Sequence, residues 1–349
     1  MDFEGFQDYP VSIKVIGVGG GGNNAINRMA ASSIKGVELI SVNTDLKSLN
    51  GTNGDKKLQI GVKLTKGLGS GSNPDIGEMA ALENEKEIKD LLKGADMVFV
   101  TAGMGGGTGT GAAPIVASIA KKMGILTIGI VTKPFPFEGK RRMDNAIKGI
   151  EKLRQNVDSL IVILNGNLLD ANNKKISFLE AFNIVDEVLR VGISGITGII
   201  NNPGLINVDF NDICTIMKDS GIAHMGIGVA SGEDRAVKAA DQAMNSPLLE
   251  TSLNGATGLL VNVSGSSNIS LLEINDAVNH IEKHVHSDAE IIFGTTIDET
   301  LKDEICITLI ATGLQDTGIQ APSSQISKEQ EQEYEIDIPA WLRQKNRSR

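Results

Sequence analysis

The first half of the chain alternates short apolar runs with longer segments in which apolar residues recur at helical spacing. The apolar runs have the character of buried strands and cover Val11–Val18, Val37–Val42, Met97–Ala102, Ile125–Thr132 and Ser159–Leu164. Helical spacing is found at Asn24–Ser32, Ile76–Leu92 and Pro114–Met123, the last with its proline near the first turn. Glycines end the first and third runs and lead into helices. This alternation predicts a parallel α/β sheet with helices on both faces.

A long helix and a second set of strands follow in the other half of the chain. Apolar residues recur at helical spacing across Ile176–Val191, and because no strand comes directly after it, we expect this helix to bridge two domains. Beyond it, strands are predicted at Ile222–Ala230, Gly258–Ser264, Ala289–Gly294 and Glu304–Thr312. Helices are predicted at Asp234–Met244 and Leu271–His286. We therefore expect a second α/β domain with a mixed sheet.

The end of the chain differs in composition from the rest. The segment Ser323–Glu335 is rich in Ser, Gln and Glu and poor in apolar residues, which predicts a disordered linker. Beyond it stands Trp341, the only tryptophan in the chain, and Ile338, Trp341 and Leu342 would share one face of a short helix. Apolar anchors of this kind are typical of peptides that bind in a groove of a partner. A basic run follows, which could also contact anionic lipid weakly.

Composition limits the classes of function. The length of 349 residues fits two domains with tails, and the net charge of −10 argues against a broad nucleic-acid interface. An acidic protein can still bind nucleotides, because phosphate sites are built locally from backbone N–H groups. The two cysteines, Cys214 and Cys306, do not form a disulfide framework. With no secretory signal and no apolar run long enough to span a membrane, we expect a cytoplasmic protein.

The first glycine loop is typical of phosphate binding. The run Gly17-Val-Gly-Gly-Gly-Gly-Asn23-Asn24 matches G-x-G-x-x-G between a predicted strand and a predicted helix. Taken alone, it fits a nicotinamide or flavin enzyme equally well, since Asp45 follows the second strand where a ribose-binding acid is expected. A nicotinamide oxidoreductase is therefore one alternative.

A second glycine loop, Met104–Gly111, favours a different kind of nucleotide site. It also follows a strand and opens a helix, and Thr108 and Thr110 supply hydroxyl groups. A dinucleotide enzyme needs one glycine-rich phosphate loop, whereas two loops could hold the β- and γ-phosphates of one nucleotide from two helix N-termini. The chain lacks the P-loop pattern G-x-x-x-x-G-K-[ST], and no G-x-S-x-G elbow supports a serine hydrolase.

Two other groups of residues could carry chemistry. Asp209 and Asp212 could orient an attacking water, and Asp209 is also well placed to cap a helix that begins near Asn211. Both roles can hold together. The histidines His280, His284 and His286 are interpreted as surface residues, and we predict no metal held by protein side chains.

The run Gly105-Gly-Gly-Thr-Gly-Thr-Gly111 resembles the signature loop of the tubulin superfamily, and the chain is similar to the FtsZ family of cell-division GTPases from about Val11 to Leu314. Further segments that resemble this family are Asn43-Thr44-Asp45, Gly67-Leu-Gly-Ser-Gly71, Pro136-Phe-Glu138-Gly-Lys-Arg-Arg142, Phe182 with Asp186, Asn207-Val-Asp209-Phe-Asn-Asp212 and, in the tail, Asp337–Arg343. The sequence departs from the family at Leu164-Asn165-Gly166-Asn167, where Pro before Asn165 and Asp-Lys after it are usual, and at Cys214, where Arg is common.

The resemblance implies roles for individual residues. It assigns the α- and β-phosphates to Gly20, Gly21, Gly22, Asn23 and Asn24, and the β- and γ-phosphates to Gly107, Thr108 and Gly109. It assigns the ribose to Glu138 with Arg142 beside it, the guanine edge to Asn165 and Asp186, and the guanine ring to Phe182. It also places at the nucleotide Asn43, Thr44, Gly71, Gly105, Gly106 and Thr132. It makes Asn207, Asp209 and Asp212 catalytic residues that act in the nucleotide site of the next subunit.

The resemblance also implies the organisation and the partners. It divides the chain into a disordered N-terminus (1–10), a GTP-binding domain (11–175), a central helix and connector (176–202), a C-terminal GTPase-activating domain (203–314), a linker (315–335) and a partner-binding tail (336–349). It implies GTP and GDP as ligands, with Mg²⁺ held mainly by phosphates and water. It implies head-to-tail filaments at the division ring, tethered to the membrane only indirectly through the tail. A scaffold that polymerises without hydrolysis remains the second alternative.

Overall fold

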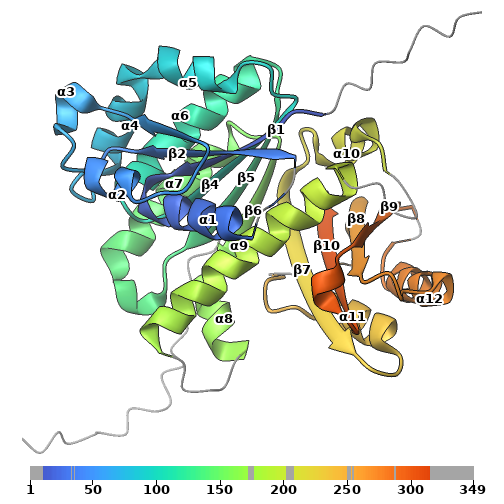
Figure 1. Cartoon of the computed structure of the whole chain (residues 1–349). Coiled ribbons are helices and arrows are strands. Elements are labelled where there is room, and N and C mark those ends of the chain that lie inside the picture. The colour runs from blue at the N-terminus through green and yellow to red at the C-terminus, as the bar shows by residue number, and fades with distance from the viewer. Residues whose placement is uncertain are drawn as a thin grey trace, which may run out of the picture. The chain divides into compact units, whose positions relative to one another are not determined.

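The computed structural model describes residues 11–32, 34, 36–171, 177–201, 208–249, 253, 255–286 and 288–314. In the first half the elements are β1 (Ile13–Val18), α1 (Gly19–Ala31), β2 (Val37–Asn43), α2 (Leu46–Asn50), β3 (Lys56–Gln59), α3 (Val62–Thr65), α4 (Pro74–Glu83), α5 (Glu85–Leu92), β4 (Met97–Gly103), α6 (Thr108–Lys122), β5 (Leu126–Lys133), η1 (Pro136–Glu138), α7 (Lys140–Arg154), β6 (Ser159–Leu164) and α8 (Asn165–Ala171). In the second half they are α9 (Phe178–Asn201), α10 (Phe210–Met217), β7 (Gly221–Ser231), α11 (Arg235–Met244), β8 (Gly258–Gly265), α12 (Leu271–Glu282), β9 (Glu290–Ile297), η2 (Glu299–Leu301) and β10 (Glu304–Thr312). Figure 1 shows their arrangement.

The strands follow the order β3-β2-β1-β4-β5-β6-β7-β10-β8-β9, and the pairs from β3 to the start of β7 are parallel. Every residue of β1 is buried, as expected for a strand covered on both faces. The chain adds β2 and β3 on one side of β1 and then β4, β5 and β6 on the other. The order therefore reverses between β1 and β4, which is where parallel α/β sheets open a crevice for ligands.

Strand β7 links the two sets of strands. Its first residues, Gly221–Ala223, pair in parallel with β6, and the rest of the strand pairs antiparallel with β10. Strand β10 is also antiparallel to β8, whereas β8 and β9 are parallel. The predicted mixed sheet in the second half is therefore confirmed.

Helix α9 confirms the predicted central helix from Phe178 onward and continues to Asn201, well beyond Val191. The extension contains glycines, which weaken a helix, but two of them pack tightly. A Cβ at Gly192 would lie 2.6 Å from the Met225 sulfur, and one at Gly195 would lie 2.9 Å from the Thr308 side chain. Glycine is needed because α9 lies directly against β7 and β10.

The structure corrects three predicted helices. The segment Ile76–Leu92 is two helices, because Asn84 breaks it and accepts a hydrogen bond from Gly61 N at 2.8 Å through its side chain. Helix α6 begins at Thr108 rather than Pro114, since the glycine loop itself forms its first turns and the proline lies inside the helix. Helix α12 ends at Glu282, and His284 and His286 lie beyond it. Strand β3 and the helices α2, α3, α7 and α8 were not predicted from the sequence pattern.

Candidate functional site

A cavity of about 540 Å³ opens at the carboxyl edge of the parallel strands, and the N-terminal half of α9 closes one side. Predicted nucleotide-binding residues that line it are Gly20, Gly21, Asn24, Asn43, Gly71, Gly106, Gly107, Thr108, Gly109, Thr132, Glu138, Arg142, Asn165, Phe182 and Asp186. Four predicted residues, Gly22, Asn23, Thr44 and Gly105, do not line it. The fold thus brings most of the predicted set together from loops that are far apart in the sequence.

The glycine loop after β1 packs directly against the loop after β4. A Cβ at Gly19 would lie 2.8 Å from the backbone nitrogen of Gly109, and one at Gly22 would lie 2.4 Å from the carbonyl oxygen of Thr101. Gly22 therefore allows a close approach of the two backbones. Asn23 is buried, and its amide is placed to donate to Gly17 O at 2.9 Å and to accept from Asn43 Nδ2 at 2.9 Å. These contacts of the buried Asn23 side chain hold the first loop in place.

The second glycine loop is held by side chains on both sides. Gly105 N donates to Thr110 Oγ1 at 2.9 Å, and a Cβ at Gly105 would lie 2.8 Å from the carbonyl oxygen of Arg142. Gly105 therefore packs against α7 rather than facing the cavity. By contrast, a Cβ at Gly106 would meet no atom within 4 Å. The backbone at Gly106 is open to a ligand.

Thr108, at the start of α6, joins three segments through hydroxyl groups. Its Oγ1 lies 2.7 Å from Thr44 Oγ1 and 3.0 Å from Ser70 Oγ. Thr44 is fully buried and lies beneath the cavity wall, whereas Ser70 and Thr108 line the cavity. This hydroxyl chain fixes the 67–73 loop against the N-terminus of α6. Sequence reasoning did not assign Ser70, although it lies inside the quoted Gly67–Gly71 motif.

The carboxylate of Asp45 caps α2 by accepting from Ser48 N at 2.9 Å. Its side chain is therefore partly used in the fold, although the residue lines the cavity. Glu138 accepts from Phe135 N at 2.9 Å and forms an ion pair with Arg142. Phe135 meets Phe182 edge to face, with ring centroids 5.1 Å apart. The cavity lining thus combines the charged pair of Glu138 and Arg142 with the ring of Phe182.

Two residues that carry hydrogen-bond acceptors line the cavity together with Phe182. Asn165 is buried, and its Oδ1 has no hydrogen-bond partner among the described residues. An unpartnered buried acceptor is costly, by about 1–3 kcal/mol, unless a ligand donates to it. The second acceptor is the carboxylate of Asp186, whose side chain is only 16% exposed. Desolvation raises its pKa to about 6, although the nearby Arg28 guanidinium lowers it. Both side chains carry oxygens that accept hydrogen bonds from N–H donors.

The carboxylates of Asp209 and Asp212 lie outside this cavity. Asp209 accepts from Asp212 N at 2.8 Å, and Asp212 accepts from Asp209 N at 3.1 Å, which makes a reciprocal cap at the start of α10. The predicted capping role is therefore confirmed. Both residues are exposed, and Figure 1 shows α10 near the C-terminal end of α9, whereas the cavity lies along its N-terminal half. Asn207 lies outside the described residues.

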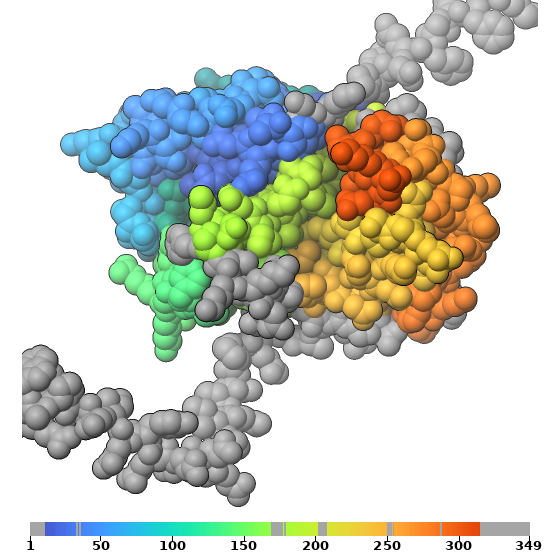
Figure 2. Space-filling model, turned by 60° about the horizontal axis from the view of Figure 1, so that its bottom comes forward, coloured from blue at the N-terminus to red at the C-terminus, as the bar shows by residue number. Residues whose placement is uncertain are grey.

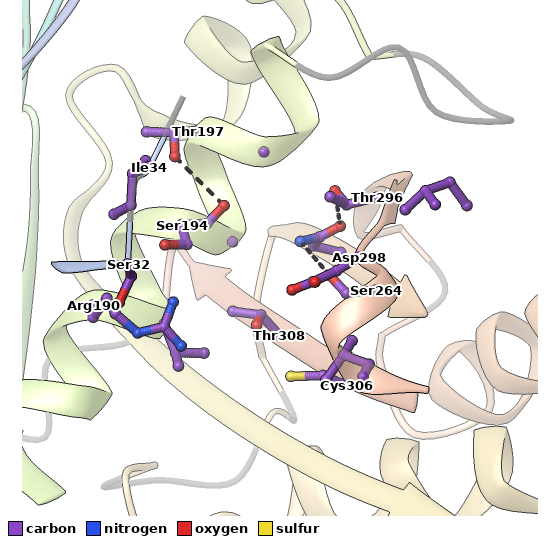
Figure 3. Close-up of a pocket in the computed structure, with 16 residues that line it drawn as sticks. Ser32, Ile34, Arg190, Ser194, Thr197, Ser264, Thr296, Asp298, Cys306 and Thr308 are labelled. Carbon is purple, nitrogen blue, oxygen red and sulfur yellow. Dashed lines mark hydrogen bonds between the residues drawn. The ribbon is translucent and has the colours of Figure 1, made fainter. Parts of the chain in front are cut away.

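A second cavity, of about 220 Å³, lies between the C-terminal half of α9 and the strands β8, β9 and β10 (Figure 3). Arg190, Ser194, Asp298, Cys306 and Thr308 are among its lining residues. Burial raises the pKa of the Cys306 thiol to about 11, so it is a poor nucleophile at neutral pH. The guanidinium of Arg190 is paired with Glu187, with the closest atoms 2.6 Å apart. This cavity is separate from the glycine loops.

The remaining predictions concern metals and the ends of the chain. Among the described residues, no group of three or more His, Cys, Asp or Glu side chains is placed to hold a metal ion. His280 Nε2 lies 2.6 Å from Asp241 Oδ1, and His284 Nδ1 lies 2.8 Å from the carbonyl oxygen of His280. In the part of the chain that the structure describes, no helix is long and apolar enough to cross a membrane. Ile338, Trp341 and Leu342 lie outside that part.

Comparison with known families identifies the chain. Residues 12–173 match the model of the Tubulin/FtsZ family GTPase domain, and residues 221–315 match that of the FtsZ family C-terminal domain. An FtsZ structure from M. jannaschii, described as an empty dimer, shares 45% sequence identity over 89% of this chain and 90% of that one, with a TM-score of 0.86. The chain belongs to the FtsZ family.

More distant structures share the fold. The GDP-bound monomer of CetZ1 from Haloferax volcanii is 20% identical over 88% of this chain and 95% of its own, with a TM-score of 0.76. A GTPγS-bound protofilament of CetZ2 from the same organism is 19% identical over 87% and 94%, with a TM-score of 0.75. As an FtsZ-family protein, the chain carries a GTPase domain that binds guanine nucleotide. The nicotinamide oxidoreductase hypothesis is therefore wrong.

Proposed function

We propose that this FtsZ-family protein polymerises head to tail in a GTP-dependent manner, forms the filaments of a cell-division ring, and completes GTP hydrolysis between adjacent subunits. The observation that carries the proposal is the separation of two half-sites in one chain. The glycine loops and base-recognising acceptors lie at one end of α9, and the exposed carboxylates of Asp209 and Asp212 lie near the other end. A head-to-tail contact whose rotation does not close into a ring generates filaments.

In the proposed nucleotide site, the backbone N–H groups of the two glycine loops bind the phosphates. They do so from the N-termini of α1 and α6, where helix dipoles and free N–H groups favour anions. Glu138 accepts from the ribose hydroxyls, and Phe182 packs on the base. Asn165 and Asp186 recognise guanine, because their oxygens accept from the N–H groups that adenine lacks. Mg²⁺, held through phosphates and water, would neutralise phosphate charge.

The proposed hydrolytic step uses the carboxylates of the next subunit. Asp209 and Asp212 are fixed by their reciprocal cap, so they enter the neighbouring site with little loss of side-chain freedom. There they orient and polarise the attacking water, assisted by Asn207. Phosphoryl transfer depends mainly on such positioning and on charge stabilisation. The alternative of a non-hydrolysing scaffold leaves these exposed carboxylates without a role beyond capping α10.

Phosphate release measured against protein concentration, with sedimentation in parallel, tests this mechanism. A shared site predicts that specific activity is low in dilute protein and rises cooperatively as filaments form. Activity strictly proportional to concentration would contradict it. Mixing two variant proteins sharpens the test. Asp212→Asn keeps an intact nucleotide pocket, and Gly107→Ala keeps the carboxylates of Asp209 and Asp212, so the two variants together can form a complete site. Activity in the mixture that exceeds the sum of the two separate variants would be expected only for a site built from two chains.

The remaining parts of the proposal concern location and partners. We propose that the protein acts in the cytoplasm at the division site, and that the tail around Trp341 binds division proteins and membrane tethers. Peptide binding tested with the isolated segment 336–349 and with its Trp341→Ala variant would check the tail. The M. jannaschii FtsZ dimer and the CetZ2 protofilament support assembly of copies of this fold.

A further inference from the structure

Arg28 lies in the last turn of α1, and its side chain reaches across to α9. The two helices lie side by side, as Figures 1 and 2 show from different directions. The guanidinium Nη2 donates to Asn183 Oδ1, and Nε lies 3.7 Å from Asp186 Oδ2. Asn183 and Asp186 are one turn apart on α9, so they present the same face of that helix to Arg28.

Asp186 lines the nucleotide cavity, whereas Arg28 does not. Asp186 therefore connects Arg28, which is outside the cavity lining, to the cavity. A carboxylate has two oxygens with about four acceptor positions, so it can interact with Arg28 and still accept from a ligand. Asn183 fixes the guanidinium by a hydrogen bond, which limits the positions that Arg28 can take.

Arg28 is the cation that acts on this buried carboxylate. Desolvation raises the pKa of Asp186 to about 6, and the charge and hydrogen bonding of Arg28 oppose that rise. The other charged residues lining the cavity are Asp45, Glu138 and Arg142, and the last two are paired with each other. On α9 itself, Glu187 is paired with Arg190. Without Arg28, a larger fraction of Asp186 would be protonated at neutral pH.

We propose that Arg28 is a positioning residue for base specificity: from α1 it keeps the Asp186 carboxylate ionised and oriented, and it thereby sets the preference of the site for guanine over adenine. This inference rests on the proposed recognition of guanine by Asp186. An ionised carboxylate accepts from both N1–H and N2–H₂ of guanine, whereas adenine presents an acceptor at N1. A protonated carboxyl would donate as well as accept, and the distinction between the two bases would weaken.

The test is a calorimetric titration of nucleotide-free protein with GDP and with ADP, between pH 5.5 and pH 8, for the wild type and for Arg28→Gln. Glutamine keeps a donor for Asn183 and removes the charge. In the wild type, GDP affinity is full well above pH 6 and falls as the pH drops through that value, because the neutral carboxyl forms there. In Arg28→Gln we expect this midpoint to move upward by about one pH unit, so that GDP affinity falls about twofold relative to the wild type at pH 7 and about fivefold at pH 6. Arg28→Lys keeps the charge and is expected to retain most of the affinity and the original midpoint.

Asp186→Asn separates the inference from the proposed function. If Asp186→Asn keeps both the GDP preference and the fall in affinity at low pH, the assignment of Asp186 to guanine is wrong. If Asp186→Asn loses the preference while Arg28→Gln leaves preference and midpoint unchanged, Arg28 has only a structural role and this inference is overturned. In the double variant, Arg28→Gln should add nothing to the loss of preference caused by Asp186→Asn. Thermal unfolding of each variant reports whether it folds. If Arg28→Gln does not fold, the GDP affinities and midpoints of Arg28→Lys and of Asn183→Ala are compared instead.

Discussion

The hydroxyl oxygen of Ser70 lies 3.0 Å from that of Thr108, which ties the 67–73 loop to the first residue of the helix that follows the second glycine loop. Both side chains are almost completely buried, at 6% and 8% exposure, although both residues line the cavity at the glycine loops. The loop is therefore held at the cavity by a contact within the protein and not only by a ligand.

This contact predicts a measurable role for Ser70. In Ser70→Ala, Thr108 keeps its partner Thr44 but the loop loses its link to α6. Loss of one such hydrogen bond corresponds to about 0.5–1.5 kcal/mol, so nucleotide affinity should fall about two- to tenfold. Calorimetric titration with GDP measures the change, and Ser231→Ala, an exposed serine at the end of β7 that does not line the cavity, is the control. Unchanged affinity in Ser70→Ala would mean that the loop is held by its backbone alone.

Gly107 should not tolerate a side chain. A Cβ at this position would lie 2.2 Å from Ser70 Oγ and 2.7 Å from the backbone nitrogen of Asn73. Since one of these atoms is backbone, the 67–73 loop must move, and we expect Gly107→Ala to lower GDP affinity by more than about tenfold. Gly51→Ala is the matched control, because a Cβ at Gly51 has its nearest neighbour at 3.5 Å and lies away from the cavity. Equal affinities for the two variants would show that the loop position does not matter for binding.

The two roles of Asp209 and Asp212 can be separated by substitution. Asparagine retains an oxygen that can accept the capping hydrogen bonds but carries no charge, so Asp209→Asn and Asp212→Asn should leave thermal stability nearly unchanged. If the carboxylates polarise water in the next subunit, GTP turnover should fall by tenfold or more while GTP binding persists. Asp209→Ala should in addition destabilise α10 by about 1 kcal/mol, because it removes the cap. Wild-type turnover in Asp212→Asn would leave this residue with a capping role only.

Arg235 and Glu273 predict a pH-dependent contribution to stability in the second half of the chain. Arg235 is 9% exposed and bonds Glu273 Oε1 at 2.7 Å, and this hydrogen bond lowers the pKa of Glu273 to about 2 from 4.5. Because the folded pKa is lower than the unfolded one, the stabilisation is present above about pH 4.5 and is lost as the pH falls toward 2. Glu273→Gln should lower the free energy of unfolding by about 1–2 kcal/mol at pH 7.

Denaturant unfolding at pH 7 and at pH 3.5 checks this prediction. The difference between wild type and Glu273→Gln should narrow at the lower pH. Glu282→Gln, an exposed glutamate at the other end of α12, should match the wild type at both values. If the difference in unfolding free energy between wild type and Glu273→Gln is the same at both pH values, the lost stability comes from packing and not from the charge of Glu273.

The sequence by itself determined the main features of the fold and the location of the two glycine loops. Buried parallel strands such as β1 are continuous apolar runs, which can be recognised in the sequence. The glycine runs after β1 and β4 can be recognised in the same way, and glycine is required there because two backbones meet. The capping role of Asp209 was also predictable, because an N-cap interacts with residues only a few positions away. The break at Asn84 was not, because its cause is a hydrogen bond to Gly61 from a distant segment.

Only the tertiary structure decided which side chains support the site. Arg28 and Asp186 belong to helices far apart in the sequence, and nothing in the residues around Arg28 indicates that α1 lies against α9. Likewise, the glycines of α9 indicate a weak helix until the packing of Gly192 against Met225 explains them. Local patterns record periodicity, backbone freedom and capping, because these depend on neighbouring residues. The electrostatic environment of a buried carboxylate depends on every segment that the fold brings to it, and so it appears only once the chain is folded.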